Sequence, residues 1–171
     1  MHTDLPQDMI LAWERGEWQV LAARMDTAAL QQGDTPTKAL VVFNPEGAPA
    51  SAVAVFRARF PVRADVGPQP VTVRDSAGRA VPSRIVNETL TGDAAHPGKR
   101  IWEFDLLFRA DDVPARGWRA YAATYGRAPD APEWEEPAAS SPTLRALETD
   151  CHPGDVPGTG SVGTGAAPPQ G

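Results

Sequence analysis

The chain has 171 residues, of which 42% are hydrophobic, and a formal net charge of −6 at pH 7. This length fits one domain with appendages, and no apolar run approaches the ~20 residues that a membrane helix needs. The negative charge argues against binding to a nucleic-acid backbone, which needs clustered Lys and Arg. The composition therefore predicts neither a nucleic-acid partner nor a membrane partner.

The compartment is indicated by the N-terminus and by the cysteine count. Residues 1–7 lack the basic start and the apolar stretch of a signal peptide. Cys151 is the single cysteine, which excludes an internal disulfide and fits a reducing compartment. We therefore expect a cytoplasmic protein.

Residues 8–32 carry the pattern of an amphipathic helix and lie in an N-terminal unit that we assign to residues 1–37. Gly16 weakens the middle of this helix by roughly 1 kcal/mol relative to Ala. Trp13 and Trp18 must pack on something, because an exposed apolar face promotes association. The apolar residues that recur at spacings near three and four are Met9, Ile10, Trp13, Val20, Leu21 and Met25. We expect self-association through this helix if its face stays uncovered.

The period of the pattern changes to two at residue 38, which predicts β-strands. Turn signals rich in Gly, Pro, Asn and Asp separate the strands, and no helical pattern lies between them. The expected strands are residues 38–44, 51–60, 70–75, 80–86, 100–109 and 119–125. Residues 101–108 alternate well, with Trp102 on the side predicted to be core. The fold class is therefore mainly β, an antiparallel β-sandwich over residues 38–126 with one N-terminal α-helix.

The alternating pattern decays after residue 126. Residues 127–150 read as a linker, within which residues 143–150 start a further strand that has no partner left to pair with. Residues 151–171 are dominated by Gly, Pro, Ser, Thr and Ala, and such a segment cannot offset its ordering entropy by burial. We therefore expect a disordered C-terminal tail.

The residues that bind metals in proteins are few and scattered. His2, His96 and His152 share no metal-ligand spacing. Cys151 and His152 are adjacent but lack the second ligand pair of a zinc site. We therefore expect solvated histidines, no metal site and no cofactor.

Two carboxylates are candidates for a catalytic pair. Glu103 and Asp105 stand at i and i+2 of one strand, so their side chains lie ~6–7 Å apart on one face, which overlaps the separation in glycosidases. Glycosidases, however, place the two groups on opposite sides of a cleft. An exposed polar face is the better interpretation, and we assign no catalytic residue.

Aromatic side chains offer a possible contact with carbohydrate, because the apolar face of a sugar ring complements an indole or phenol ring. Trp102 is better explained as core. The candidates for contact are Trp118, Tyr121 and Trp134.

Several motifs, taken in order, resemble one sandwich subdomain of glycoside hydrolase family 38, the α-mannosidases. Residues 40–45 (LVVFNP) resemble the family's strand that ends in Asn-Pro. Residues 71–83 (VTVRDSAGRAVPS) resemble its strand, glycine turn and strand with proline. Residues 104–108, followed by 113–121 (VPARGWRAY), resemble its closing motif. Residues 143–150 (TLRALETD) resemble the entry to the larger sandwich that follows.

The resemblance implies a truncated, non-catalytic part of such an enzyme. In this family the zinc ion and the aspartate nucleophile come chiefly from an N-terminal α/β domain, so no catalytic residue or zinc ligand is carried over to this chain. The implied role is support of the catalytic domain, with possible carbohydrate contact at the edge of the sugar cleft. The alternative is a free-standing sandwich module that binds carbohydrate or protein. Packing of Trp13 and Trp18 on the chain's own sheet would distinguish a self-sufficient unit from a fragment.

Overall fold

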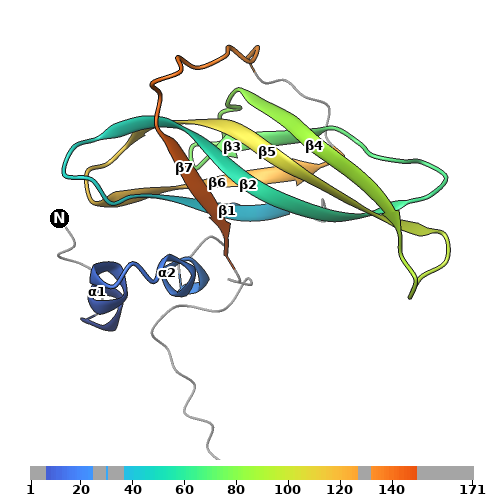
Figure 1. The fold of residues 1–171 in the computed structure, drawn as a ribbon, viewed down its shortest axis with the longest axis horizontal. Coiled ribbons are helices and arrows are strands. Elements are labelled where there is room, and N and C mark those ends of the chain that lie inside the picture. Colours follow the sequence, from blue (N-terminus) through green and yellow to red (C-terminus); the bar gives the residue numbers. More distant parts are fainter. Residues whose placement is uncertain (1–6, 25–29, 31–36, 127–131, 150–171) are drawn as a thin grey trace, which may run out of the picture.

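The computed structural model describes residues 7–24, 30, 37–126 and 132–149. Two short helices and seven strands lie within these residues (Figure 1). They are α1 (Gln7–Glu14), α2 (Trp18–Arg24), β1 (Thr37–Asn44), β2 (Ala50–Arg63), β3 (Val71–Asp75), β4 (Ser83–Gly92), β5 (Lys99–Val113), β6 (Gly117–Tyr125) and β7 (Thr143–Glu148). The expected disordered tail, 151–171, lies outside the described residues.

The expectation of one continuous helix over residues 8–32 is wrong, because α1 ends at Glu14 and α2 begins at Trp18. Gly16 has a φ of +68°, a left-handed conformation that glycine adopts without steric penalty. Its N–H donates to the carbonyl of Trp13, and the N–H of Glu17 donates to the carbonyl of Ala12. These two hydrogen bonds are those of a Schellman motif. Gly16 therefore terminates a helix instead of only weakening one.

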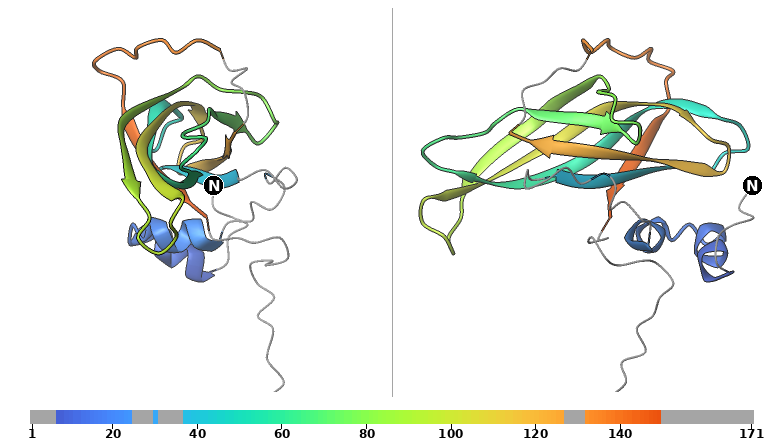
Figure 2. Two further views of the ribbon diagram at one scale, coloured as in Figure 1. Left: turned by 90° about the vertical axis from the view of Figure 1, so that its right-hand side faces the viewer. Right: turned by 180° about the vertical axis from the view of Figure 1, so that it is seen from behind.

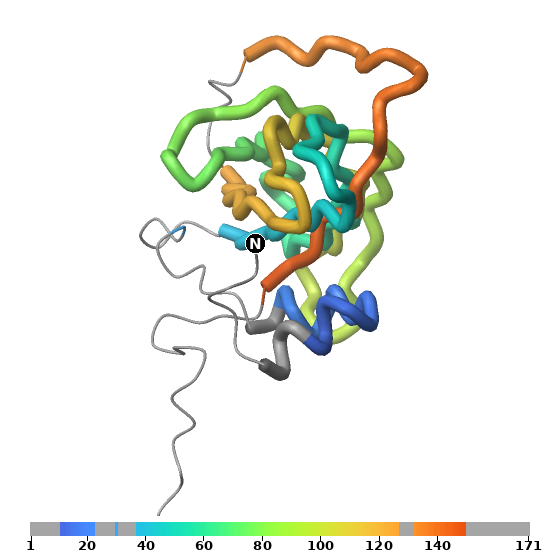
Figure 3. The backbone as a smooth tube through the Cα atoms, turned by 90° about the vertical axis from the view of Figure 1, so that its left-hand side faces the viewer, coloured from blue at the N-terminus to red at the C-terminus, as the bar shows by residue number. Residues whose placement is uncertain are grey.

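The mainly β fold is confirmed, and the strands form one sheet in the order β3-β6-β1-β7-β2-β5-β4. The sheet curls so that its two halves face each other around a common core, as the end-on views show (Figures 2 and 3). The ring of Tyr125 on β6 stacks at 5.3 Å on Phe60 of β2, across this core. The pairings are antiparallel except for β2 with β7, which is parallel. The sandwich is therefore mixed and not purely antiparallel.

The expectation that the strand at residues 143–150 lacks a partner is also wrong. β7 pairs antiparallel with β1, where Val41 faces Leu147, and parallel with β2, where Val53 faces Thr143. It thus joins the two halves of the sandwich. A strand that inserts between β1 and β2 leaves no local signal of its partners in the sequence.

The predicted alternation along residues 101–108 is confirmed in β5. The inward side chains are at most 3% exposed and are Trp102, Phe104, Leu106 and Phe108. Between them Glu103 and Asp105 are only partly buried. At ~25 cal/mol per Å² of apolar surface, burial of such a row of large side chains is the main stabilising contribution to the sheet.

The two helices cover the outer face of β1 (Figure 1). The Trp13 ring lies 5.1 Å from that of Trp18 and 5.8 Å from that of Phe43, and Trp18 lies 5.5 Å from Phe43. Leu21, Val41 and Leu147 complete this second cluster. The two tryptophans therefore pack on the chain's own sheet. Neither described helix is long and apolar enough to cross a membrane.

Candidate functional site

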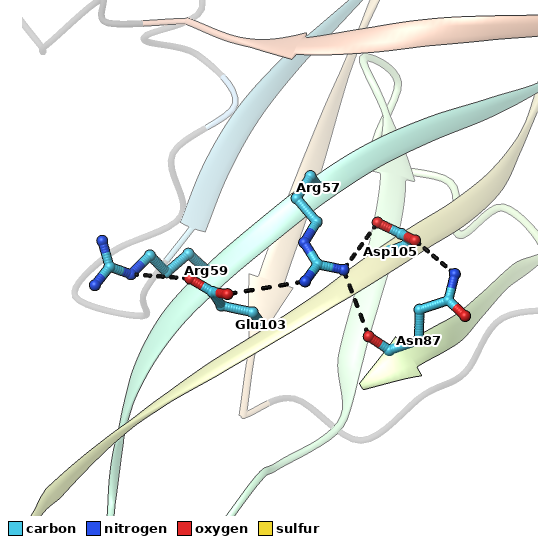
Figure 4. Close-up of polar contacts among 5 residues, drawn as sticks. All are labelled: Arg57, Arg59, Asn87, Glu103 and Asp105. Carbon is cyan, nitrogen blue, oxygen red and sulfur yellow. Dashed lines mark hydrogen bonds and ion pairs between the residues drawn. The ribbon is translucent and has the colours of Figure 1, made fainter. Parts of the chain in front are cut away.

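The two carboxylates weighed as a catalytic pair lie on the outer face of β5 and are both engaged by arginines of β2 (Figure 4). Arg57 lies opposite Asp105 in the register, and its guanidinium is 3.1 Å from that carboxylate. Arg59 lies opposite Glu103 at 3.4 Å, and Arg57 also reaches Glu103 at 3.8 Å. Opposite charges on facing strands stabilise a sheet.

Asn87 of β4 completes this polar cluster. Its side-chain amide donates a 2.7 Å hydrogen bond to the Asp105 carboxylate. Its backbone carbonyl accepts a hydrogen bond from the Arg57 guanidinium. Asn87 has a φ of +54° and lies where the β4–β5 register shifts, between Val86 and Thr89. This β-bulge aims the amide at the carboxylate. The strand expected at residues 80–86 is found at Ser83–Gly92 and continues past this bulge.

The pKa of Asp105 lies below its usual value. The hydrogen bond from Asn87 is the largest cause, burial opposes it, and the hydrogen bond and charge of Arg57 add to it. A carboxyl held in its ionised form cannot serve as a general acid near neutral pH. Glu103 and Asp105 thus form a structural ion-pair ladder.

The described residues do not offer a zinc site. Within them, no group of three or more His, Cys, Asp or Glu side chains could hold a metal ion. His96 instead lies 3.0 Å from the Asp93 carboxylate in the turn between β4 and β5. His2, Cys151 and His152 lie outside the described residues.

The structure does not bring the three aromatic candidates together. Trp118 and Tyr121 are three residues apart on β6, so their side chains point to opposite faces. Trp118 packs towards the helices, 6.4 Å from Trp13. The ring of Tyr121 is buried in the core, 4.9 Å from Phe108, and cannot act as a stacking platform. Trp134 is half-buried in the segment that precedes β7.

A polar pocket of about 370 Å³ lies where β3, β5 and β6 come together. Its lining residues are Asp75, Arg79, Ala80, Val81, Pro82, Arg109, Asp111, Asp112, Arg119 and Tyr121. Asp75 and Tyr121 face each other in the β3–β6 register. The acidic residues come from separate elements, Asp75 from the end of β3 and Asp111 and Asp112 from the end of β5. Only the pairing of strands distant in sequence brings them to one pocket, so no local signal could have found it.

Two ion pairs and one hydrogen bond to a backbone carbonyl lie within this pocket. Arg79 lies 2.8 Å from Asp75, and Arg109 lies 3.2 Å from Asp111. Arg119 donates a 2.9 Å hydrogen bond to the carbonyl of Asp112. Burial opposes ionisation of Asp75, but hydrogen bonds from Arg79 and from backbone N–H groups outweigh it, so the pKa of Asp75 is lowered. The carboxylate of Asp75 is therefore held in its ionised form and accepts hydrogen bonds.

Tyr121 supplies the pocket with a hydroxyl. Burial raises the pKa of Tyr121 to about 12, and the charges of Arg119, Asp111 and Asp75 also act on it. The hydroxyl is therefore neutral and can both donate and accept a hydrogen bond. The pocket thus combines a neutral hydroxyl with carboxylate and guanidinium groups.

A second hollow, an apolar groove of about 500 Å³, lies between α2 and β7. Trp18, Phe43 and Leu147 line it, and Val20 at the same groove is 49% exposed. The groove borders the cluster in which the helices pack on the sheet.

The motifs that open and close the sandwich meet at one corner. The side-chain amide of Asn44, at the end of β1, donates to the carbonyls of Ala48, Val113 and Pro114. Its side-chain oxygen accepts from the N–H of Glu46. Asn44 is fully buried, so these bonds replace its contact with water.

No family model and no curated protein sequence matches this chain. Among solved structures, it is similar to a protein in the glycosyl hydrolase family 38 from Enterococcus faecalis, with 18% identity and a TM-score of 0.48 over 72% of this chain. It is also similar to an alpha-mannosidase from Enterococcus faecalis V583, with 19% identity and a TM-score of 0.42 over 75% of this chain. The chain spans 16% of the length of each. Both solved structures are described as belonging to the enzyme family, or having the activity, that the sequence motifs indicate.

Proposed function

We propose that the chain is a non-catalytic β-sandwich module of an α-mannosidase-like glycoside hydrolase, in which it supports the catalytic domain. The observation that carries this proposal is the corner at Asn44. The residues that give the resemblance build the fold: Asn44 bonds three carbonyls, and Gly117 allows close approach to Pro114. Residues that hold the fold together in this way are expected in a module that supports another domain.

The ion-pair ladder of β2 and β5 supports the same proposal. Glu103 and Asp105 are engaged by arginines, and the lowered pKa of Asp105 removes it as a proton donor. The purified chain with zinc is expected to hydrolyse an aryl α-mannoside no faster than a protein-free control. Turnover that disappears in Glu103→Gln or Asp105→Asn would refute the non-catalytic role.

The supporting role has its own test. We expect a family 38 α-mannosidase whose corresponding segment is replaced by residues 7–149 to fold and keep its zinc-dependent activity. The matched control carries Asn44→Ala in the same chimera, which should lower its melting temperature because the corner is lost. A chimera that folds but binds no substrate would argue against the role in support.

The second candidate is a free-standing module that binds carbohydrate. It is favoured by the packing of Trp13 and Trp18 on Phe43, because the helical face is then covered by the chain itself. A self-sufficient unit should be monomeric in size-exclusion chromatography with light scattering. A stable dimer would instead support self-association through the helices.

A further inference from the structure

The hydroxyl of Tyr121 is a polar group in an unusual position. The residue is 2% exposed and its ring packs on Phe108 in the core, yet it lines the polar pocket. The hydroxyl is not one of the buried polar atoms that lack a hydrogen-bond partner among the described residues, so it is not a destabilising group in the core. A tyrosine hydroxyl can both donate and accept a hydrogen bond. A group placed in this way is ready to bond a molecule that enters the pocket.

The charges of the pocket select the class of that molecule. Three arginines and three aspartates line it, so their formal charges balance. An anion would face the three carboxylates, and a cation would face the three guanidinium groups. A neutral molecule with several hydroxyl groups is repelled by neither set of charges. Each of its hydroxyls can donate a hydrogen bond to a carboxylate and accept one from a guanidinium.

The size of the pocket and its apolar wall further limit which neutral molecules fit it. Its volume of about 370 Å³ is near the lower end of small-molecule sites. Ala80, Val81 and Pro82 supply an apolar side. A sugar ring has an apolar C–H face and a polar rim of hydroxyls, so one ring fits such a mixed lining.

We propose that this pocket binds a neutral polyol of the size of one hexose unit, with the Tyr121 hydroxyl and the side chains of Asp112 and Arg119 as its direct contacts. The proposal rests on the carbohydrate contact considered for the second candidate function and names its site. It places the contact at the hydroxyl of Tyr121 and not at the faces of Trp118 or Trp134. The high pKa of Tyr121 keeps its hydroxyl protonated over the physiological range.

The test is a titration of the whole chain with D-mannose, D-glucose and myo-inositol, followed by ¹⁵N chemical-shift changes and ligand-observed NMR. At least one of the three is expected to shift the amides of the pocket residues. Tyr121→Phe keeps the buried ring and removes only the hydroxyl, and it should weaken binding at least tenfold. Arg119→Gln should weaken it as well, whereas inorganic phosphate should not compete.

The matched control is Tyr125→Phe on the same strand. Its hydroxyl donates to the carbonyl of Gly67 at 3.3 Å, and the residue does not line the pocket. This variant should bind as the wild type does. Circular dichroism and the unfolding midpoint of each variant show whether it is folded, so a loss of binding is assigned to the hydroxyl only in a folded protein.

Two results would overturn the proposal. One is the absence of binding by all three neutral probes at concentrations of tens of millimolar. The other is binding that survives Tyr121→Phe but is lost in Trp118→Phe, which would move the carbohydrate contact to the aromatic surface. Neither result affects the supporting role, which the chimera tests separately.

Discussion

The side-chain amide of Asn44 donates a 3.1 Å hydrogen bond to the carbonyl oxygen of Val113, a residue 69 positions further along the chain. The same amide bonds Pro114, and the N–H of Arg116 donates to the carbonyl of Glu46. One buried side chain therefore holds the turn after β1 against the turn before β6.

Replacement of Asn44 by Ala is expected to destabilise the protein by about 3 kcal/mol, because buried carbonyls lose their donor. Urea unfolding followed by far-UV circular dichroism measures this free energy. Asn44→Asp is the informative partner, since it keeps an acceptor for the N–H of Glu46 but places an anion beside three carbonyls. It should be at least as destabilising as Asn44→Ala. A stability of Asn44→Asp equal to the wild type would show that the amide donor is unimportant.

Substitution at Gly117 tests the close packing of the same corner. A Cβ atom at this position would lie 2.9 Å from the Cβ of Pro114, closer than real Cβ contacts allow. Gly117→Ala is therefore expected to lower the free energy of unfolding by about 1–3 kcal/mol through overpacking. Gly47→Ala is the control, because nothing lies within 4 Å of its added Cβ. Equal effects of the two substitutions would contradict the packing argument.

The ladder at Asp105 predicts a dependence of stability on pH. Its pKa is lower in the folded chain than the value of about 3.9 expected for an unfolded one. The stabilisation is therefore complete above about pH 5 and is lost as the pH falls through the folded pKa. Asp105→Asn should show a shallower loss of stability in acid than the wild type. Asn87→Ala removes the largest cause of the shift, so NMR titration should find the pKa of Asp105 raised. An unchanged pKa in that variant would refute the assignment.

The aromatic cluster under the helices should contribute strongly to stability. Trp13 is 9% exposed against Phe43 and Trp118, and its replacement by Ala is expected to lower the free energy of unfolding by about 3 kcal/mol. Leu11 lies on the same helix but is 41% exposed, so Leu11→Ala should change stability by only about 0.5 kcal/mol. Chemical denaturation of the two variants compares them directly. A small effect of Trp13→Ala would mean that the helices are only loosely attached.

Local patterns predicted the parts of the fold that depend on neighbours in sequence. The alternation of Trp102 and Phe104 with Glu103 is a property of one strand, and β5 formed as expected. Gly16 was recognised as a weakness, but propensity alone does not distinguish a weakened helix from a Schellman end. The bulge at Asn87 was not predicted, because it depends on a contact with the neighbouring strand.

The candidate site was less predictable than the fold. The sequence singled out Tyr121, but as an exposed ring, whereas the structure buries the ring and presents the residue to a polar pocket. Asp75 joins it only through the pairing of β3 with β6, whereas Arg119 is two residues away on the same strand and lies on the same face. Such convergence is set by long-range register, which a single sequence does not reveal.

The position of β7 has a consequence for the order of folding. It is the last described strand in the chain but lies fourth in the sheet, between β1 and β2. During synthesis the facing edges of β1 and β2 therefore stay open until Thr143–Glu148 has left the ribosome. Open strand edges invite pairing with other chains, and pairings between residues distant in sequence form slowly. The nascent chain is thus most vulnerable to aggregation just before β7 is made.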